Sequence, residues 1–267
     1  MCDRKDWVRL SCEEKIRLYN EAMNLRKKYG WGKRRIAKAL GLDPSLVGNW
    51  IRRGSKPFSR WNKPNLEPSP ELSFVVGVIL GDGSVYYTSR RYNIRLDATD
   101  KSFVEEFSTC LAKVLKKEKP YRIQFKKPKG KRSPVWVVQA RSRMFYEWFK
   151  SGKWREVARR FPREFLRGFY LSEGSFEINK HRNNTSAIKI YNKDLEKLRF
   201  VQEILKLCGF KSDIHKGHNA YFLHIHGGHK KNLEFLNFIG VSPQCKLFTM
   251  KEPKEGRFGG CVIERVE

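Results

Sequence analysis

The chain has 267 residues, of which 40% are hydrophobic, and its 56 lysines and arginines outnumber 28 aspartates and glutamates to give a formal net charge of +28 at pH 7. This imbalance indicates a polyanionic partner, because each phosphate that a basic side chain neutralises releases condensed counterions. The sequence has no run of about 18 apolar residues and no basic and apolar leader, so we expect an intracellular protein of the cytoplasm or nucleoid that does not enter a membrane. Its six cysteines are scattered, which argues against a zinc ribbon and fits a reducing compartment.

Residues 1–56 predict a small helical domain. Apolar residues recur at helical spacing from Glu13 to Tyr29, and the shorter segments Lys33–Leu40 and Pro44–Arg53 lie on either side of a glycine turn. Asp43 is placed to cap the third helix. A short helix, a tight turn and a second, basic helix form the helix-turn-helix pattern, so we predict a DNA-binding module rather than a plain three-helix bundle. The predicted base-contacting residues of the third helix are Ser45, Asn49 and Arg52.

Beyond a proline-rich linker at 57–70, the sequence predicts two half-domains, 71–161 and 162–267. Each has the order helix, strand, strand, helix, strand, strand, helix. After its leading helix the first contains Ser84–Thr88, Tyr92–Ala98, Lys101–Leu115, Tyr121–Lys126, Val135–Ala140 and Arg143–Lys150. The second contains Ser175–Lys180, Ser186–Tyr191, Lys193–Cys208, Phe210–Lys216, Ala220–His226 and Lys230–Ile239. The predicted fold class is therefore α+β, a pseudo-symmetric αββαββα duplication preceded by a small all-α domain.

The predicted strands alternate between apolar and polar residues, so one face of each sheet would be covered by helices and the other would be polar. A polar ribbon of long side chains fits the major groove of DNA, where such side chains read base edges. We therefore predict DNA contacts on this face, in preference to an ordinary solvated face or, for the histidines of the second half, a zinc site. The predicted contacts are Arg91, Asn93, Arg95, Arg122, Gln124, Lys126, Asn179, His181, Lys189, His224 and His226. The aromatic residues are expected mostly in the core.

Each half-domain opens with the same short motif, an apolar helix with a central glycine that ends in a small residue, an acid and a glycine. The two copies are Val75–Gly83 and Leu166–Gly174. A glycine inside a helix costs about 1 kcal/mol relative to alanine, so Gly77 and Gly168 predict two helices in close contact. That contact would bring Asp82 and Glu173 together at the helix C-termini, where the helix dipole disfavours two carboxylates unless a cation binds them.

Nearby carboxylates that bind Mg²⁺ beside phosphates are typical of metal-assisted phosphodiester hydrolysis. The predicted metal ligands are Asp82 and Glu173, with the backbone carbonyls of Gly81 and Ser172 as further candidates. Gly83 and Gly174 are expected to act as helix stops.

The paired motif resembles the signature of the LAGLIDADG homing endonuclease family, in a single chain that carries both half-domains. The resemblance implies that the sheets grip DNA in the major groove and that water cuts both strands across the minor groove, leaving 3′ overhangs, with Mg²⁺ bridging Asp82 and Glu173. It also implies a basic residue near each active centre. Lys246 fits this role in the second half-domain, and Lys153 or Lys150 fits it in the first.

These observations predict a metal-dependent, site-specific double-strand DNA endonuclease that works as a monomer on a long pseudo-palindromic or asymmetric target. Two alternatives on the same fold stay open. One is a non-catalytic DNA-binding regulator, which would bind a specific site without cutting it. The other is an RNA-binding maturase, which would bind structured intron RNA more tightly than duplex DNA.

Overall fold

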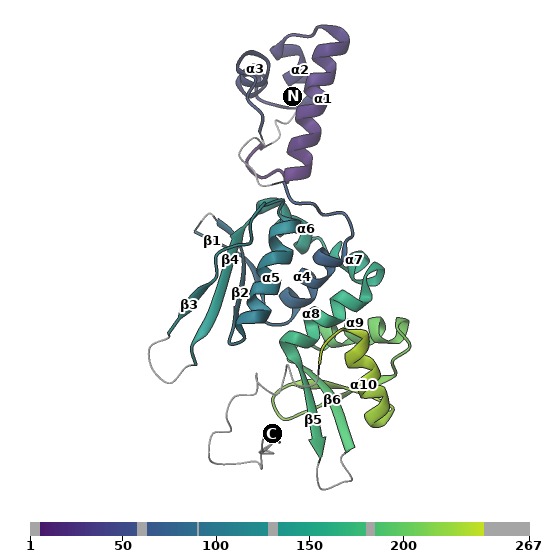
Figure 1. The fold of residues 1–267 in the computed structure, drawn as a ribbon. Helices are drawn as coiled ribbons and strands as arrows, with labels where there is room; N and C mark the ends of the chain where they lie inside the picture. Colours follow the sequence, from purple (N-terminus) through teal and green to yellow (C-terminus); the bar gives the residue numbers. More distant parts are fainter. Residues whose placement is uncertain (1–5, 58–62, 90, 128–132, 180–184, 243–267) are drawn as a thin grey trace. The chain divides into compact units, whose positions relative to one another are not determined.

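The computed structural model describes residues 6–57, 63–89, 91–127, 133–179 and 185–242, and within these ranges the chain forms ten helices and eight strands (Figure 1). Contacts divide the chain into two compact units. The first contains Met1–Leu66, Val85–Ile94 and Ala140–Lys153, and the second contains Glu67–Ser84, Arg95–Gln139 and Trp154–Glu267. In the described part of the chain, no helix combines the length and the apolar character needed to cross a membrane.

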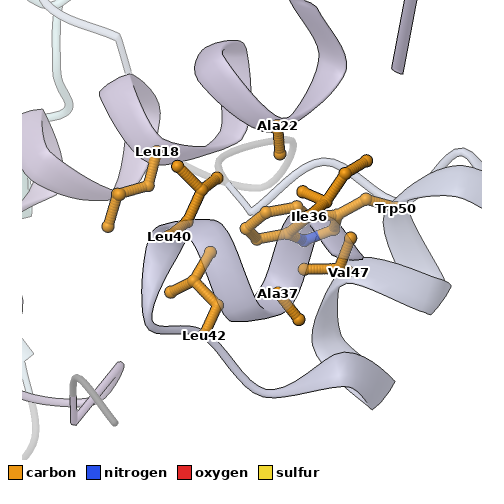
Figure 2. Packing of buried hydrophobic residues seen from close by; sticks show 8 residues of the cluster. All are labelled: Leu18, Ala22, Ile36, Ala37, Leu40, Leu42, Val47 and Trp50. Carbon is orange, nitrogen blue, oxygen red and sulfur yellow. The ribbon is translucent and has the colours of Figure 1, made fainter. Parts of the chain in front are cut away.

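Three N-terminal helices form where the sequence predicts them. They are α1 (Cys12–Tyr29), α2 (Lys33–Leu40) and α3 (Pro44–Arg53). Ser11 and Glu14 close a capping box at the start of α1, and the Asp43 carboxylate accepts from the backbone N–H groups at the start of α3. Their core is a cluster of side chains that include Trp50, Ile36 and Val47, each at most 2% exposed (Figure 2).

Helix α6 (Arg143–Lys150) lies in the same unit and contacts the start of α1. The Cys12 backbone N–H donates to a Glu147 carboxylate oxygen at 2.7 Å. Arg143 pairs with Glu147 at 2.6 Å and also donates to the Leu10 carbonyl at 3.0 Å. The side chains of α6 therefore form hydrogen bonds with two backbone groups near the start of α1 that are not bonded by the capping box of α1.

The second unit is built around two helices that carry the repeated motif, α4 (Pro70–Leu80) and α8 (Pro162–Glu173). The other helices of this unit are α5 (Lys101–Val114), α7 (Trp154–Arg160), α9 (Leu195–Leu207) and α10 (Gly228–Phe238). Of these, α7 is absent from the predicted order. The Ser73 hydroxyl donates to the Phe161 carbonyl at 2.8 Å and so ties α4 to the chain between α7 and α8.

Eight strands form two four-stranded sheets of matching order, β1-β2-β4-β3 and β5-β6-β8-β7. The first consists of β1 (Ser84–Thr88), β2 (Arg91–Ala98), β3 (Gln124–Lys126) and β4 (Val135–Arg141). The second consists of β5 (Gly174–Asn179), β6 (Thr185–Asn192), β7 (Ser212–Lys216) and β8 (Tyr221–Ile225). The repeated order confirms the predicted α+β duplication.

Two predicted strands are shorter than expected because neighbouring groups take their backbone hydrogen bonds. The Ser108 hydroxyl donates to the Tyr121 carbonyl at 2.7 Å, and β3 begins only at Gln124. The Phe210 N–H donates to the Leu205 carbonyl at 2.9 Å and closes the end of α9, so β7 begins at Ser212. In both places the first residue of the predicted strand is hydrogen-bonded to the preceding helix, to the middle of α5 in the first case and to the end of α9 in the second.

Candidate active site

The two motif helices cross with their backbones in contact at the central glycines. A Cβ atom added to Gly77 would lie 2.2 Å from the Phe165 carbonyl oxygen and 2.9 Å from the Phe169 nitrogen. One added to Gly168 would lie 2.5 Å from the Phe74 carbonyl oxygen and 2.9 Å from the Val78 nitrogen. Only glycine fits at either position, which explains why each helix contains a glycine although this residue lowers helix stability relative to alanine.

This crossing has an internal two-fold relation. Residues 74, 77 and 78 of α4 correspond to 165, 168 and 169 of α8 with the same offset of 91 that separates Asp82 from Glu173. Each glycine meets the same two positions of the opposite helix. The predicted close contact is therefore observed, and it relates the two helices by pseudo-symmetry.

The C-terminal ends of α4 and α8 also meet. A Cβ on Gly81 would lie 2.3 Å from the Ser172 Cβ and 3.2 Å from the Glu173 Cγ, so Gly81 lies directly against the residues that end α8. Asp82 follows Gly81 and is exposed, whereas Glu173 is partly buried. The glycine thus lets the acid of one helix approach the chain segment that carries the other acid.

Two polar side chains from the second half-domain complete this region. The Asn192 amide donates to Glu173 Oε1 at 2.8 Å, and Lys197 Nζ donates to the Leu80 carbonyl at 2.7 Å. A cation at the C-terminus of α4 offsets the negative end of its dipole. Sequence reasoning missed both residues, because nothing local marks a contact between positions 80 and 197. The only available signal was their place near Lys193, where the predicted helix begins.

Of the two glycines that follow the acids, Gly174 acts as the predicted helix stop, because α8 ends at Glu173 and Gly174 is its C-cap. Helix α4 ends earlier than expected, at Leu80 with Gly81 as its C-cap, so Gly83 is not the residue that ends it. Gly174 has φ −86° and ψ 153°, and neither Gly83 nor Gly174 adopts the left-handed conformation. Glycine is needed at both positions because another group of the chain lies too close for a side chain. A Cβ on Gly83 would lie 2.8 Å from the Ile79 Cα, and one on Gly174 would lie 2.2 Å from the Tyr170 ring. The missing side chain lets the chain turn directly from the last helical turn into the following strand.

The donor set at the helix ends consists of hard oxygen atoms. Two carboxylates and adjacent backbone carbonyls suit Mg²⁺ and similar cations, which prefer oxygen ligands and keep several waters. In the described ranges no group of three or more His, Cys, Asp or Glu residues is placed to hold a metal ion. A cation held by Asp82 and Glu173 would therefore complete its coordination with backbone carbonyls, water or phosphate oxygens.

The predicted basic residues lie in different surroundings. Lys153 Nζ lies 3.2 Å from Glu13 Oε1 in an exposed ion pair. Lys150 Nζ lies 5.8 Å from the centre of the Tyr146 ring. Lys246 falls outside the described residues.

The polar face predicted for the first sheet needs one correction. Asn93 is only 2% exposed, and its amide donates to the Arg91 carbonyl at 3.2 Å. The short amide side chain of Asn93 can bond to the nearby backbone and is therefore buried. The longer Arg91 side chain is exposed. Arg95 forms two hydrogen bonds of 2.6 Å with Asp97, which fix the direction of its guanidinium group.

Other predicted contacts are exposed. Gln124 and Lys126 are exposed in β3, and Arg122 is exposed in the segment before it. On α3 the three predicted base-contacting residues, Ser45, Asn49 and Arg52, are also exposed. The Asn179 side chain and His181 lie outside the described residues.

On the second sheet, two of the predicted residues contact carboxylates of the same face. Lys189 lies 2.7 Å from Glu177, and this hydrogen bond raises the lysine pKa. His226 lies 2.9 Å from Asp213. His224 is partly buried, and its pKa is lowered first by burial and then by the neighbouring His226, His215 and Lys189. The lowered pKa favours the neutral form of the His224 imidazole.

The expectation that aromatic residues belong mostly to the core is wrong for several strand residues. Tyr87 is 51% exposed, Phe125 is 49% exposed and Tyr191 is 37% exposed. Strand residues alternate between faces, so an aromatic residue at a sheet position opposite the helices keeps part of its ring in solvent.

The chain is a duplicated α+β fold whose halves meet where the two motif helices cross at their central glycines. Asp82 follows the first of these helices, and Glu173 ends the second. These features define the class of this protein. The family model described as a LAGLIDADG-like domain matches residues 69–151 and 160–239. The chain therefore belongs to the LAGLIDADG-like family. The matches begin at residue 69, after the three N-terminal helices.

Two relatives come from Methanocaldococcus jannaschii. The uncharacterized protein MJ0398 is 33% identical over 215 residues, covering 77% of this chain and 75% of the relative. The uncharacterized protein MJ0314 is 39% identical over 159 residues, 56% of each chain.

Among solved structures, the homing endonuclease I-WcaI bound to its DNA recognition sequence is 14% identical with a TM-score of 0.51, covering 70% of this chain and 88% of that chain. I-DmoI in complex with DNA and Mn is 21% identical with a TM-score of 0.48, covering 65% of this chain and 97% of that chain. The likeness to I-WcaI agrees with the duplicated fold.

Proposed function

We propose that this chain is a site-specific DNA endonuclease that cuts both strands of a duplex and leaves 3′ overhangs. The observation that carries the proposal is the placement of Asp82 and Glu173 at the meeting ends of two pseudo-symmetric helices. One such acid would be an ordinary helix-end residue. Two at matching places of a repeat, in a chain of net charge +28, suit a substrate with two similar negatively charged strands.

Asp82 and Glu173 would hold a divalent cation, Mg²⁺, with help from the carbonyls of Gly81 and Ser172. When bound, the cation supplies a Lewis acid that polarises phosphate and favours deprotonation of water. The Asn192 amide holds one oxygen of Glu173 and so directs its other oxygen. Basic residues would stabilise the charge that develops on the phosphate, with Lys246 for one centre and Lys153 or Lys197 for the other.

The DNA would lie against the outer faces of both sheets, in agreement with the alternation of exposed polar and buried apolar strand residues. The segment 1–56 would add a helix-turn-helix module that uses Ser45, Asn49 and Arg52 of α3. We place the linker at 57–70 and the half-domains at 71–161 and 162–267. One chain supplies both acids, so a monomer would suffice. The solved structures of I-WcaI and I-DmoI, described with DNA and in the second case with Mn, support this choice of partner and cation class.

The test is cleavage of a plasmid library with random inserts in the presence of Mg²⁺. Wild type is expected to cut a small set of related sites, and Asp82→Asn or Glu173→Gln to lose cleavage while keeping DNA binding. A matched control is Glu156→Gln, which removes one exposed carboxylate from α7. It should cut like wild type.

Three outcomes would contradict parts of the proposal. Tight site-specific binding without any cut would indicate a DNA-binding regulator. A preference for structured intron RNA over duplex DNA would indicate a maturase. Normal cleavage by both acid variants would show that the chemistry lies elsewhere in the chain.

A further inference from the structure

Three rings lie side by side across the second sheet. Tyr191 of β6 is the register partner of Phe222 of β8, and Phe222 is the register partner of His215 of β7. The Tyr191 and Phe222 ring centres are 5.7 Å apart, and those of Phe222 and His215 are 5.2 Å apart with nearly parallel planes. We call these three residues the aromatic row.

The aromatic row lies on the face of the sheet that turns away from the core. The next register row, Ile190, Leu223 and Ile214, occupies the opposite face, where Ile190 and Leu223 are at most 1% exposed. Tyr191 is 37% exposed and His215 is exposed. The rings are therefore open to a partner on the face that the proposed function assigns to DNA.

Two side chains of the described part of this face, Lys189 and His226, contact carboxylates within the protein. Glu177 holds Lys189, and Asp213 holds His226. Lys189 Nζ also lies 5.7 Å from the Phe222 ring centre. Lys189 is thus held by a carboxylate, and the three rings add apolar surface to this part of the face.

We propose that the aromatic row reads thymine methyl groups in the major groove of one half of the target site. This inference rests on the proposed function and adds to it the kind of base that the second sheet selects. The thymine methyl is the apolar group that base pairs present in the major groove, and it is recognised by apolar contact. The row spans about 11 Å, or roughly three base steps at 3.4 Å per nucleotide, and its three rings can meet two or three of the positions within that length.

The experiment begins with wild-type protein, which selects duplex sites from a random library by gel shift without Mg²⁺. Each thymine of a selected site is then replaced by deoxyuridine, which lacks only the methyl group. We expect uracil to weaken binding about fourfold at each of two or three neighbouring positions in one half-site. Uracil at other positions should have no effect. This step needs no change to the protein, so it does not depend on the folding of a variant.

Variants then connect the effect to the rings. Phe222→Ala should abolish the uracil penalty at those positions, and Phe222→Leu, which keeps apolar surface, should retain part of it. Tyr87→Ala removes an exposed ring from the first sheet and should leave the penalty unchanged. A penalty that persists in Phe222→Ala would overturn the assignment to the aromatic row.

The failures of the two proposals are distinguishable. A chain that selects a site but tolerates uracil at every position contradicts this inference alone, and the aromatic row then serves only to stabilise the sheet. A chain that selects no duplex site contradicts the proposed function and this inference with it.

Discussion

At the scale of single residues, the two acids of the repeated motif have different neighbours. Glu173 is partly buried and accepts a hydrogen bond from Asn192, whereas Asp82 is exposed. Lys197 donates to the Leu80 carbonyl, two residues before Asp82. The first half-domain has Phe103, 5% exposed, three residues after its helix cap, where the second has Lys197. The two halves therefore share a backbone plan and differ in the polar groups around their acids.

The position of Lys197 leads to a prediction about cleavage. Lys197→Met should lower the rate of plasmid cleavage at least about tenfold, because it removes a fixed cation beside the region where charge develops. Lys153→Met is the comparison. Its exposed ion pair with Glu13 contributes about 0–1 kcal/mol, so its loss should leave folding intact. Single-turnover rates under saturating protein measure the effect. A larger loss for Lys153→Met would assign the basic role to Lys153.

Cys12 leads to a prediction about alkaline pH. Burial, followed by the negative charge of Glu147, raises the pKa of its thiol from 9.0 to about 12. A folded-state pKa above the unfolded value stabilises the fold fully below pH 9, and this contribution is lost as the pH rises towards 12. The stability advantage of wild type over Cys12→Ala should therefore shrink by up to about 1.4 kcal/mol per pH unit in this window.

Urea unfolding of both proteins at several pH values between 8 and about 11.5 measures this advantage. The difference in free energy of unfolding between wild type and Cys12→Ala should not change with pH below pH 9. A constant difference throughout would show that the thiol ionises in the folded chain as it does in the unfolded one.

At the scale of elements, the crossing of α4 and α8 leaves no room for a side chain at either central glycine. The contact joins backbone to backbone, so the structure has no flexible side chain that can move aside. Arg167 of α8 adds a second tie through two 3.0 Å hydrogen bonds to Glu106 of α5. The geometry of the acids depends on this crossing.

Gly77→Ala should destabilise the second unit by at least about 2 kcal/mol, because its Cβ would overlap the Phe165 carbonyl oxygen. The matched control is Gly48→Ala, also inside a helix. Its Cβ would meet the Lys33 side chain at 3.1 Å and the Arg52 guanidinium at 3.5 Å, and both side chains are flexible. Alanine there should be neutral or stabilise by up to about 1 kcal/mol. Thermal unfolding distinguishes the two, and equal shifts for both variants would contradict the close crossing.

At the scale of the whole molecule, positive charge is distributed along the chain. Residues 1–70 contain 17 lysines and arginines against 7 aspartates and glutamates, and the rest of the chain is also basic. If both parts contact one duplex, many phosphates are neutralised at once. Affinity for DNA should then depend steeply on salt.

We expect affinity for a selected site to fall by at least about 10³-fold between 50 and 200 mM salt, the loss typical of six or more phosphate contacts. Fluorescence anisotropy at a series of salt concentrations gives the slope. A chain shortened to begin at residue 67 is the comparison, with circular dichroism to verify folding. The salt dependence of its affinity should be weaker than that of the full chain if helices α1 to α3 contact phosphates. An equal salt dependence would show that these helices make no phosphate contacts.

Much of the fold could be predicted because it depends on local patterns. Glycine turns, the Asp43 cap and strand alternation place most elements within a few residues, and the repeat supplies the duplication. The crossing of Gly77 and Gly168 follows from the cost of glycine inside a helix. The contacts of Asn192 and Lys197 could not be predicted in this way, since they join segments far apart in sequence. Asn93 was wrongly predicted to be an exposed DNA contact, because strand alternation does not indicate that its amide bonds to the neighbouring backbone.

The glycine crossing has a consequence for protein engineering. Its tightest contacts join backbone atoms, which every amino-acid sequence shares, so the close approach at the two glycines does not depend on particular side chains. Halves from different members of the family could therefore be joined as interchangeable modules, provided that each keeps its central glycine and the spacing to its acid. Recombination of this kind would let the left and right parts of a target vary independently, which two copies of one identical half cannot achieve.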